Sequence, residues 1–194
     1  MNSAPLWHRL SIEEYLAFEE HSDTKHEYVD GVLYAMVGGT DRHNLINGSM
    51  YAELRSAARG GPCRVFISDV KLQAANDAFY YPDIMMVCDP DDDDPLVKTQ
   101  PVLLAEVLSP STERVDRTDK LMAYRAIDCL QTYLIVHQDR RLVEWHQRAP
   151  SGGWQRIDVL ERGRIPMPHL DLELTLDDIY MDVGLPTADS DDDV

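Results

Sequence analysis

AFYYPDIMMVCD, residues 78–89, has the composition of a buried β-strand with a break in its middle. Most of its residues are aromatic, β-branched or otherwise apolar, which is typical of a strand that packs on both faces. Pro82 cannot donate a ladder hydrogen bond. Asp83 places a carboxylate in an apolar wall, and its burial costs several kcal/mol unless something pairs it. The stretch therefore predicts a strand that stops pairing at Pro82 and turns Asp83 toward a partner.

The segments on either side of this stretch predict an α/β fold with a central mixed sheet. Two further strand-like runs, 64–73 and 101–109, are expected to be its sheet neighbours. A helical pattern over 114–128 followed by an apolar run over 131–139 indicates a strand–helix–strand crossover. The remaining expected elements are a helix over 12–20 with a capping box, a hairpin at Asp30-Gly31, a helix over 41–59, and antiparallel or closing segments over 141–148, 153–160 and 170–180.

Length and charge indicate one domain with acidic extensions. At 194 residues the chain is expected to form a single domain over 1–185, followed by an acidic disordered tail over 186–194. The net charge is −17, but nine aspartates lie in DPDDDDP (89–95) and ADSDDDV (188–194), so −17 plus 9 leaves about −8 for the remainder. The first run is interpreted as a solvated loop. It does not fit a calcium loop, because Asp94 stands where glycine is needed and Gln100 where a glutamate is needed.

Cysteine usage and hydropathy predict a cytoplasmic protein. Cys63, Cys88 and Cys129 lie in apolar runs without paired spacing, so we expect buried thiols and no disulfide framework or zinc site. The sequence begins without a basic-then-apolar leader, and no apolar run approaches the roughly 18 to 20 residues of a membrane span.

A second isolated carboxylate lies in the run PVLLAEVLS, residues 101–109. Glu106 has only Leu104 and Leu108 as same-face neighbours within that run. Two adjacent apolar strands that each contribute one carboxylate, Asp83 and Glu106, call for a cation between them. Mg²⁺ meets that demand because it binds oxygen ligands and keeps positions for water and phosphate. Lys120, on the crossover helix, is the candidate for stabilising the negative charge of a phosphoryl transition state.

These residues also resemble a known family pattern. YPD followed 23 residues after its aspartate by AEV resembles the PD-(D/E)XK nuclease signature. The wider string PDIMMV…LLAEVLSPST…DK…Y…QTYLIV closely resembles the Uma-two family of endonucleases, members of the restriction-endonuclease-like fold. The resemblance covers nearly the whole chain and weakens in the C-terminal quarter. It implies a central mixed β-sheet flanked by helices, here with additional antiparallel C-terminal strands, and Mg²⁺-dependent phosphodiester hydrolysis, with Mn²⁺ as a possible substitute.

The same resemblance implies a four-residue site. Glu27, Asp83 and Glu106 would be the catalytic and metal-binding acids, with Lys120 as the catalytic cation. The lysine of the parent signature, two residues after the acid, is replaced by Leu108, so Lys120 matches the displaced lysine of this family.

Alternative roles remain open for several of these residues. Glu27 could instead form a hairpin-edge ion pair with Lys25 or Arg42. Lys71 is the rival lysine, although an ion pair with Asp69 would explain it without catalysis. His43 also matches a family position, and a hydrogen bond at the start of its helix is favoured over substrate contact.

Three functions are consistent with the sequence. The first is a metal-dependent endonuclease acting on DNA, for which a positive stripe of Arg114, Arg117 and Arg125 is expected because phosphate contacts supply most non-specific affinity. The second is a catalytically weak binding or regulatory module that engages a basic protein partner through its acidic surface. The third is a metal-dependent hydrolase of small phosphate esters. Cleavage of duplex DNA usually needs two sites, so a homodimer is expected by analogy, with the edges of the C-terminal strands as a possible contact.

Overall fold

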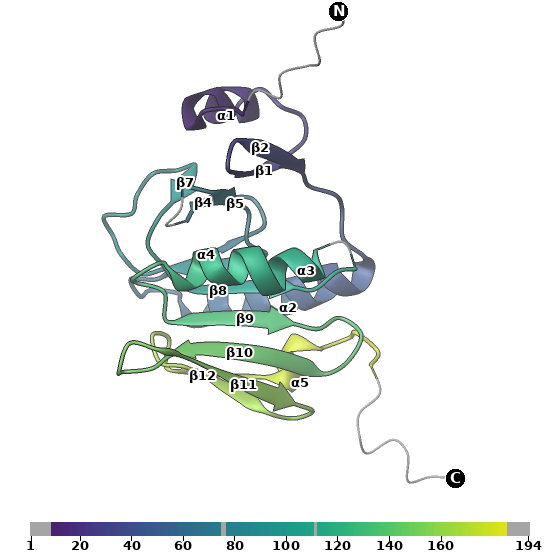
Figure 1. The fold of residues 1–194 in the computed structure, drawn as a ribbon. Coiled ribbons are helices and arrows are strands. Elements are labelled where there is room, and N and C mark those ends of the chain that lie inside the picture. Colours follow the sequence, from purple (N-terminus) through teal and green to yellow (C-terminus); the bar gives the residue numbers. More distant parts are fainter. Residues whose placement is uncertain (1–8, 75–76, 111, 186–194) are drawn as a thin grey trace, which may run out of the picture.

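A computed structural model describes residues 9–74, 77–110 and 112–185 (Figure 1). The predicted acidic tail over 186–194 lies outside the described residues, as does Asn76 of a predicted turn. Within the described residues, no helix is long and apolar enough to cross a bilayer.

The main feature of the fold is a six-stranded mixed sheet with the order β11-β10-β9-β8-β6-β3. Neighbouring strands are antiparallel except β8 and β9, which run parallel. A helical crossover connects this parallel pair, as the strand–helix–strand pattern predicted. The strands are β3 (Arg64–Ile67), β6 (Ile84–Val87), β8 (Pro101–Val107), β9 (Thr132–Val136), β10 (Leu142–Arg148) and β11 (Trp154–Leu160).

Helices cover both faces of this sheet (Figure 1). One face packs against α2 (Asp41–Ala57), where Ile46, Met50 and Leu54 are fully buried. The same face is closed by the hairpin β12 (Arg164–Met167) and β13 (Leu172–Thr175) and by the short helix α5 (Leu176–Ile179). The other face packs against the crossover, which consists of α3 (Glu113–Val115), a π-helical turn η1 (Asp116–Lys120) and α4 (Leu121–Arg125). The restriction-endonuclease-like prediction of a mixed sheet flanked by helices is confirmed.

A smaller sheet shows that two of the predicted strands are each split in two. Its order is β2-β1-β5-β4-β7, formed by β1 (His26–Val29), β2 (Val32–Ala35), β4 (Lys71–Gln73), β5 (Phe79–Tyr80) and β7 (Val97–Lys98). The predicted run 64–73 breaks at Ser68, whose φ is 52°. The run 78–87 breaks at Pro82, so β5 belongs to the small sheet and β6 to the large one. Proline therefore marks the point where the chain leaves one sheet and enters the other.

The N-terminal elements follow the sequence closely. Helix α1 (Ile12–Glu19) begins with the predicted capping box: the Glu14 backbone N–H donates to the Ser11 hydroxyl over 3.2 Å, and the Ser11 N–H donates to the Glu14 carboxylate over 2.7 Å. The β1–β2 hairpin turns at Asp30 and Gly31, which have φ values of 50° and 82°. This left-handed pair is the geometry that Asp-Gly turns favour.

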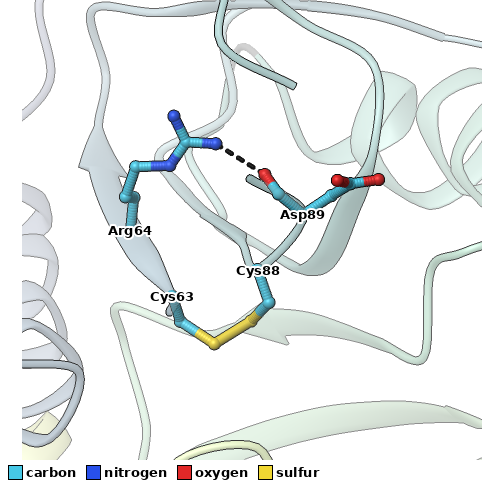
Figure 2. The surroundings of a disulfide bond; sticks show 4 residues. All are labelled: Cys63, Arg64, Cys88 and Asp89. Carbon is cyan, nitrogen blue, oxygen red and sulfur yellow. Dashed lines mark hydrogen bonds between the residues drawn. A yellow bond between two sulfur atoms is a disulfide. The ribbon is translucent and has the colours of Figure 1, made fainter. Parts of the chain in front are cut away.

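The prediction that all three cysteines are free is wrong for two of them. Cys63 and Cys88 form a disulfide with an S–S distance of 2.00 Å (Figure 2). Arg64 pairs with Val87 across β3 and β6, so the two cysteines are opposite each other one position further along. Their separation of 25 residues carries no sign of this contact, because strand register creates it. Cys129 is a free thiol.

The acidic loop over 89–95 makes more contacts with the rest of the protein than a solvated loop would. Asp92 is buried, and its carboxylate accepts the backbone N–H groups of Thr99 and Gln100 over 3.0 and 2.9 Å. Lys98 and Arg64 donate to backbone carbonyls of the same loop. These contacts fasten the loop against β3 and β7, and they correct the interpretation of the whole run as a solvated segment.

Candidate active site

The break at Pro82 places Asp83 beside Glu106. Ile84 pairs with Ala105 across β6 and β8, so Asp83 and Glu106 lie one position further along these neighbouring strands. The Asp83 carboxylate accepts the Val107 backbone N–H over 2.8 Å, which holds it against the end of β8. The sheet register thus places the two predicted carboxylates at facing positions of neighbouring strands.

Lys120 lies in the centre of an acidic cluster. Its Nζ is 2.9 Å from Glu27 Oε1, 3.1 Å from Glu106 Oε1 and 3.3 Å from Asp116 Oδ1. Only 5% of the lysine side chain is exposed. The Tyr124 hydroxyl also donates to Glu106 Oε1, over 2.8 Å. The crossover therefore delivers Lys120 to the carboxylates, and Glu27 pairs with it instead of with Lys25 or Arg42.

Burial and mutual attraction shape the titration of this cluster. Burial raises the pKa of Glu106 well above its usual value, and attraction to Lys120 offsets only part of that effect. Burial alone would lower the pKa of Lys120, but Glu106, Glu27 and Asp116 outweigh it and raise that pKa well above the usual value. Lys120 is consequently a permanent cation, whereas Glu106 is an unusually basic carboxylate.

His43 forms a second pair with Asp83. Its Nε2 is 3.2 Å from Asp83 Oδ2, and its backbone N–H, not its ring, makes the helix-start hydrogen bond to Thr40 Oγ1. Burial would lower the pKa of His43 and raise that of Asp83. The hydrogen bond and attraction between them outweigh burial, so the His43 pKa is raised and the Asp83 pKa is lowered. The ring therefore steadies Asp83 in its ionised form.

Asp116 is a member of the cluster that the sequence analysis missed. Its side chain is 1% exposed, and its Oδ1 lies 3.3 Å from the Lys120 ammonium. Burial raises its pKa, with Lys120 acting in the opposite direction. The spacing of four residues to Lys120 within the predicted helix was the available signal, because such residues share a helix face. A π-helical turn at this point is also a common mark of functional sites.

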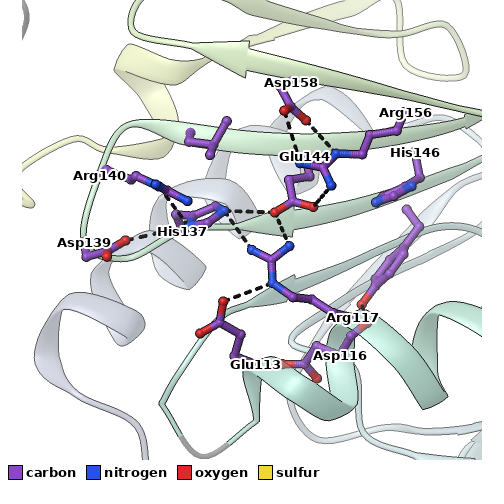
Figure 3. Close-up of polar contacts among 12 residues, drawn as sticks. Glu113, Asp116, Arg117, His137, Asp139, Arg140, Glu144, His146, Arg156 and Asp158 are labelled. Carbon is purple, nitrogen blue, oxygen red and sulfur yellow. Dashed lines mark hydrogen bonds and ion pairs between the residues drawn. The ribbon is translucent and has the colours of Figure 1, made fainter.

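The rival lysine and the predicted arginine stripe have other contacts. Asp69 pairs with Lys25, and the Lys71 ammonium lies 5.6 Å from the centre of the Tyr81 ring. Arg117 pairs with Glu113 and the buried Glu144 (Figure 3).

Arg125 is likewise used within the protein. Its Nη2 is 2.8 Å from His146 Nδ1, and its guanidinium lies over the Trp154 ring. Arg114 is exposed. Two of the three arginines of the predicted stripe thus have partners within the protein.

A metal ion needs several donor atoms arranged around one point. Within the described residues, no group of three His, Cys, Asp or Glu side chains is arranged to hold a metal ion. Glu27 and Glu106 both lie against the Lys120 ammonium, at 2.9 and 3.1 Å. All three predicted metal ligands are hard oxygen donors, and Asp83 and Glu106 are the pair that lies on neighbouring strands.

Comparison with known proteins identifies the family of this chain. Residues 12–182 match the family Uma2, described as "Putative restriction endonuclease". The chain belongs to the Uma2 family. Two relatives from Synechocystis sp. (strain ATCC 27184 / PCC 6803 / Kazusa) are the proteins slr1290 and sll1609. The first is 37% identical over 180 residues, which cover 92% of this chain and 94% of the relative. The second is 31% identical over 155 residues, 78% of this chain and 88% of the relative.

A solved structure shares the fold of this Uma2 protein. It is a crystal structure from Anabaena variabilis ATCC 29413, described as "a putative nuclease belonging to DUF820". The TM-score is 0.70 at 17% identity, over 88% of this chain and 97% of that chain. The shared fold agrees with the predicted fold, and the family, described as a putative restriction endonuclease, supports a nuclease function.

Proposed function

We propose that this Uma2 protein is a metal-dependent endonuclease that hydrolyses phosphodiester bonds of DNA. The observation that carries the proposal is the buried cluster in which Lys120 contacts three carboxylates at 2.9 to 3.3 Å, next to Asp83. Such a concentration of buried charge is costly to fold, and it is typical of sites selected for chemistry.

The charge balance of the cluster supports a divalent cation. Four acids, Glu27, Asp83, Glu106 and Asp116, face two basic groups, Lys120 and His43. With all four acids ionised and His43 protonated, four negative charges and two positive charges would leave a net charge of −2. Asp83 and Glu106 are the residues that would hold Mg²⁺, since this ion is commonly bound by one or two carboxylates with water and phosphate as its other ligands. The bound ion would polarise the phosphoryl group and favour formation of hydroxide.

The side chains of the cluster have separate roles in the proposed hydrolysis. Lys120 keeps its charge at any physiological pH, so it can stabilise the negative charge that develops on the phosphate oxygens. His43 and the Val107 N–H orient Asp83. Tyr124 fixes Glu106 through its hydroxyl hydrogen bond.

The test combines cleavage with metal binding. Supercoiled plasmid and single-stranded DNA are incubated with Mg²⁺ or Mn²⁺ and the wild type, Asp83→Asn or Lys120→Met. Asp69→Asn is the matched control, because Asp69 is an exposed aspartate, paired with Lys25, outside the cluster. We expect cleavage by the wild type and the control only. Thermal unfolding with and without Mg²⁺ should show metal stabilisation in the wild type and its loss in Asp83→Asn. Absence of both cleavage and metal stabilisation in the wild type would contradict the proposal.

A small phosphate diester is the second candidate substrate. The observation in its favour is that Arg117 and Arg125 are engaged within the protein, and the net charge of −17 repels a polyanion. Bis(p-nitrophenyl) phosphate distinguishes the two. If it is hydrolysed with Mg²⁺ while both DNA substrates stay intact, the small-ester hydrolase replaces the nuclease. DNA cleavage that falls steeply with salt supports the nuclease.

A further inference from the structure

β11 is a long strand at the edge of the six-stranded sheet. It pairs with β10 along all seven of its residues, and among the described residues no strand pairs with its other side. The consecutive residues 155–158 are all exposed. Ile157 is 40% exposed and Leu160 is 56% exposed. An edge of this length with exposed aliphatic side chains is a ready template for pairing with another strand.

The ladder with β10 fixes which backbone groups of β11 point outward. The Ala149 N–H donates to the Gly153 carbonyl over 2.7 Å at one end, and the Glu161 N–H donates to the Arg141 carbonyl over 3.3 Å at the other. Hydrogen-bonded pairs alternate along an antiparallel ladder, so the odd-numbered residues of β11 bond to β10. The N–H and C=O groups of Trp154, Arg156 and Asp158 consequently face away from the sheet, as does the N–H of Leu160, whose C=O accepts the Gly163 N–H over 2.9 Å.

We propose that this protein forms a homodimer by antiparallel pairing of β11 with β11 of a second copy, about a two-fold axis at Ile157. In this register Arg156 lies opposite Asp158 of the other copy, and Trp154 lies opposite Leu160. These are outward-facing residues, so each Arg156–Asp158 pair exchanges two backbone hydrogen bonds, and the Leu160 N–H donates to the Trp154 carbonyl of the other copy. The two Ile157 residues meet at the axis in a pair without backbone hydrogen bonds.

Charge complementarity selects this register over its neighbours. Shifting the axis by one residue to Arg156 places two arginines opposite each other, and shifting it to Asp158 places two aspartates opposite each other. Like charges directly opposite are unfavourable, whereas an Arg–Asp pair is favourable. Arg156 and Asp158 project from one face of β11, 2.7 Å apart between Nε and Oδ1 (Figure 3). The dimer therefore extends this existing pair into a four-membered network across the axis.

The first test is the mass of the full chain in solution. Light scattering over a range of concentrations should give twice the 22.1 kDa of the single chain. Ile157→Lys places two ammonium groups at the axis, and Asp158→Arg apposes two arginines, so each variant should shift the mass to that of one chain. Ile157→Val should remain dimeric, and circular dichroism checks that all variants are folded. A wild type that is monomeric up to about 100 µM, or a dimer unaffected by both charged variants, would overturn the proposal.

The second test addresses the register and does not depend on disruption. In a Cys129→Ser background, Ile157→Cys should form an intermolecular disulfide under mild oxidation, since its two copies would be directly opposite, within the usual Cα separation of bridged cysteines. Gln155→Cys is the matched control. In the proposed register its two copies lie four residues apart along the strands, about 14 Å, beyond the roughly 7 Å limit for a bridge. Failure of Ile157→Cys to cross-link, or equal cross-linking of Gln155→Cys, would refute this register. Neither test measures DNA cleavage, so its result is independent of the proposed function.

Discussion

Replacing Lys120 by methionine tests whether one ammonium group holds the buried acids together. Methionine keeps the length and apolar stem of lysine and removes only the charge. The side chains of Glu106 and Asp116, at 4% and 1% exposure, would then lack their cation, and Glu27, at 15%, would lose its closest partner. We therefore expect a large loss of stability that depends on pH.

The magnitude follows from the burial of the cluster. Removing one partner of a buried ion pair typically costs about 3–5 kcal/mol, because the remaining charge stays buried without compensation. For a domain of this size each kcal/mol lowers the melting temperature by about 2–4 °C, so the expected decrease is about 6–20 °C. Protonation of Glu106 or Asp116 relieves the cost. Both pKa values are already raised and would rise further without Lys120.

The raised pKa values of Glu106 and Asp116 set the direction of the pH dependence. A carboxyl group whose folded-state pKa is raised binds more protons in the folded state than in the unfolded state, so stability falls as pH rises from the unfolded pKa through the folded one. The variant should therefore lose most stability at pH 8 and less at pH 5. The raised pKa of Lys120 adds stability that is fully present below its unfolded pKa of about 10.4 and is lost only as pH rises through its folded pKa.

Urea unfolding without divalent metal, followed by circular dichroism at pH 5 and pH 8, measures these differences. Lys25→Met is the matched control, because Lys25 is 43% exposed and its pair with Asp69 is worth about 0–1 kcal/mol. The double variant Lys120→Met/Glu106→Gln should recover part of the loss at pH 8. The reasoning is refuted if Lys120→Met costs no more than Lys25→Met, or if its cost is the same at both pH values.

Asp116→Asn removes a carboxylate with a raised pKa, so the free energy of unfolding at pH 8 should stay level or rise by about 1 kcal/mol. DNA cleavage by this variant should fall. Lower stability together with unchanged cleavage would contradict the prediction. NMR titration should find the pKa of His43 above its usual value in the wild type and lower in Asp83→Asn. The stability from this raised pKa is fully present below the unfolded pKa of about 6.5 and is lost as pH rises through the folded pKa. A His43 titration that Asp83→Asn leaves unchanged would disprove the pair. Reduction of the bond between Cys63 and Cys88 should lower stability by about 2–4 kcal/mol in calorimetry, and a melting temperature insensitive to reductant would show that the bond is not formed.

Local patterns in the sequence determined most of the secondary structure. The capping box at Ser11, the turn at Asp30-Gly31 and the apolar periodicity of residues 41–57 act over a few residues, so each could be recognised without the fold. The isolation of Asp83 and Glu106 in apolar runs identified the candidate site for a similar reason. A buried carboxylate is costly wherever its strand is placed, so the sequence alone shows that it needs a partner.

The tertiary structure decided which partners these residues meet. The register of β3 against β6 brings Cys63 to Cys88, and the packing of α2 brings His43 to Asp83. The π-helical turn directs Asp116 and Lys120 into one cluster. The change of sheet at Pro82 likewise depends on which strands lie on either side of it. Contacts between residues far apart in the chain depend on strand register and on how the layers pack, and neither quantity is encoded in any short stretch of sequence.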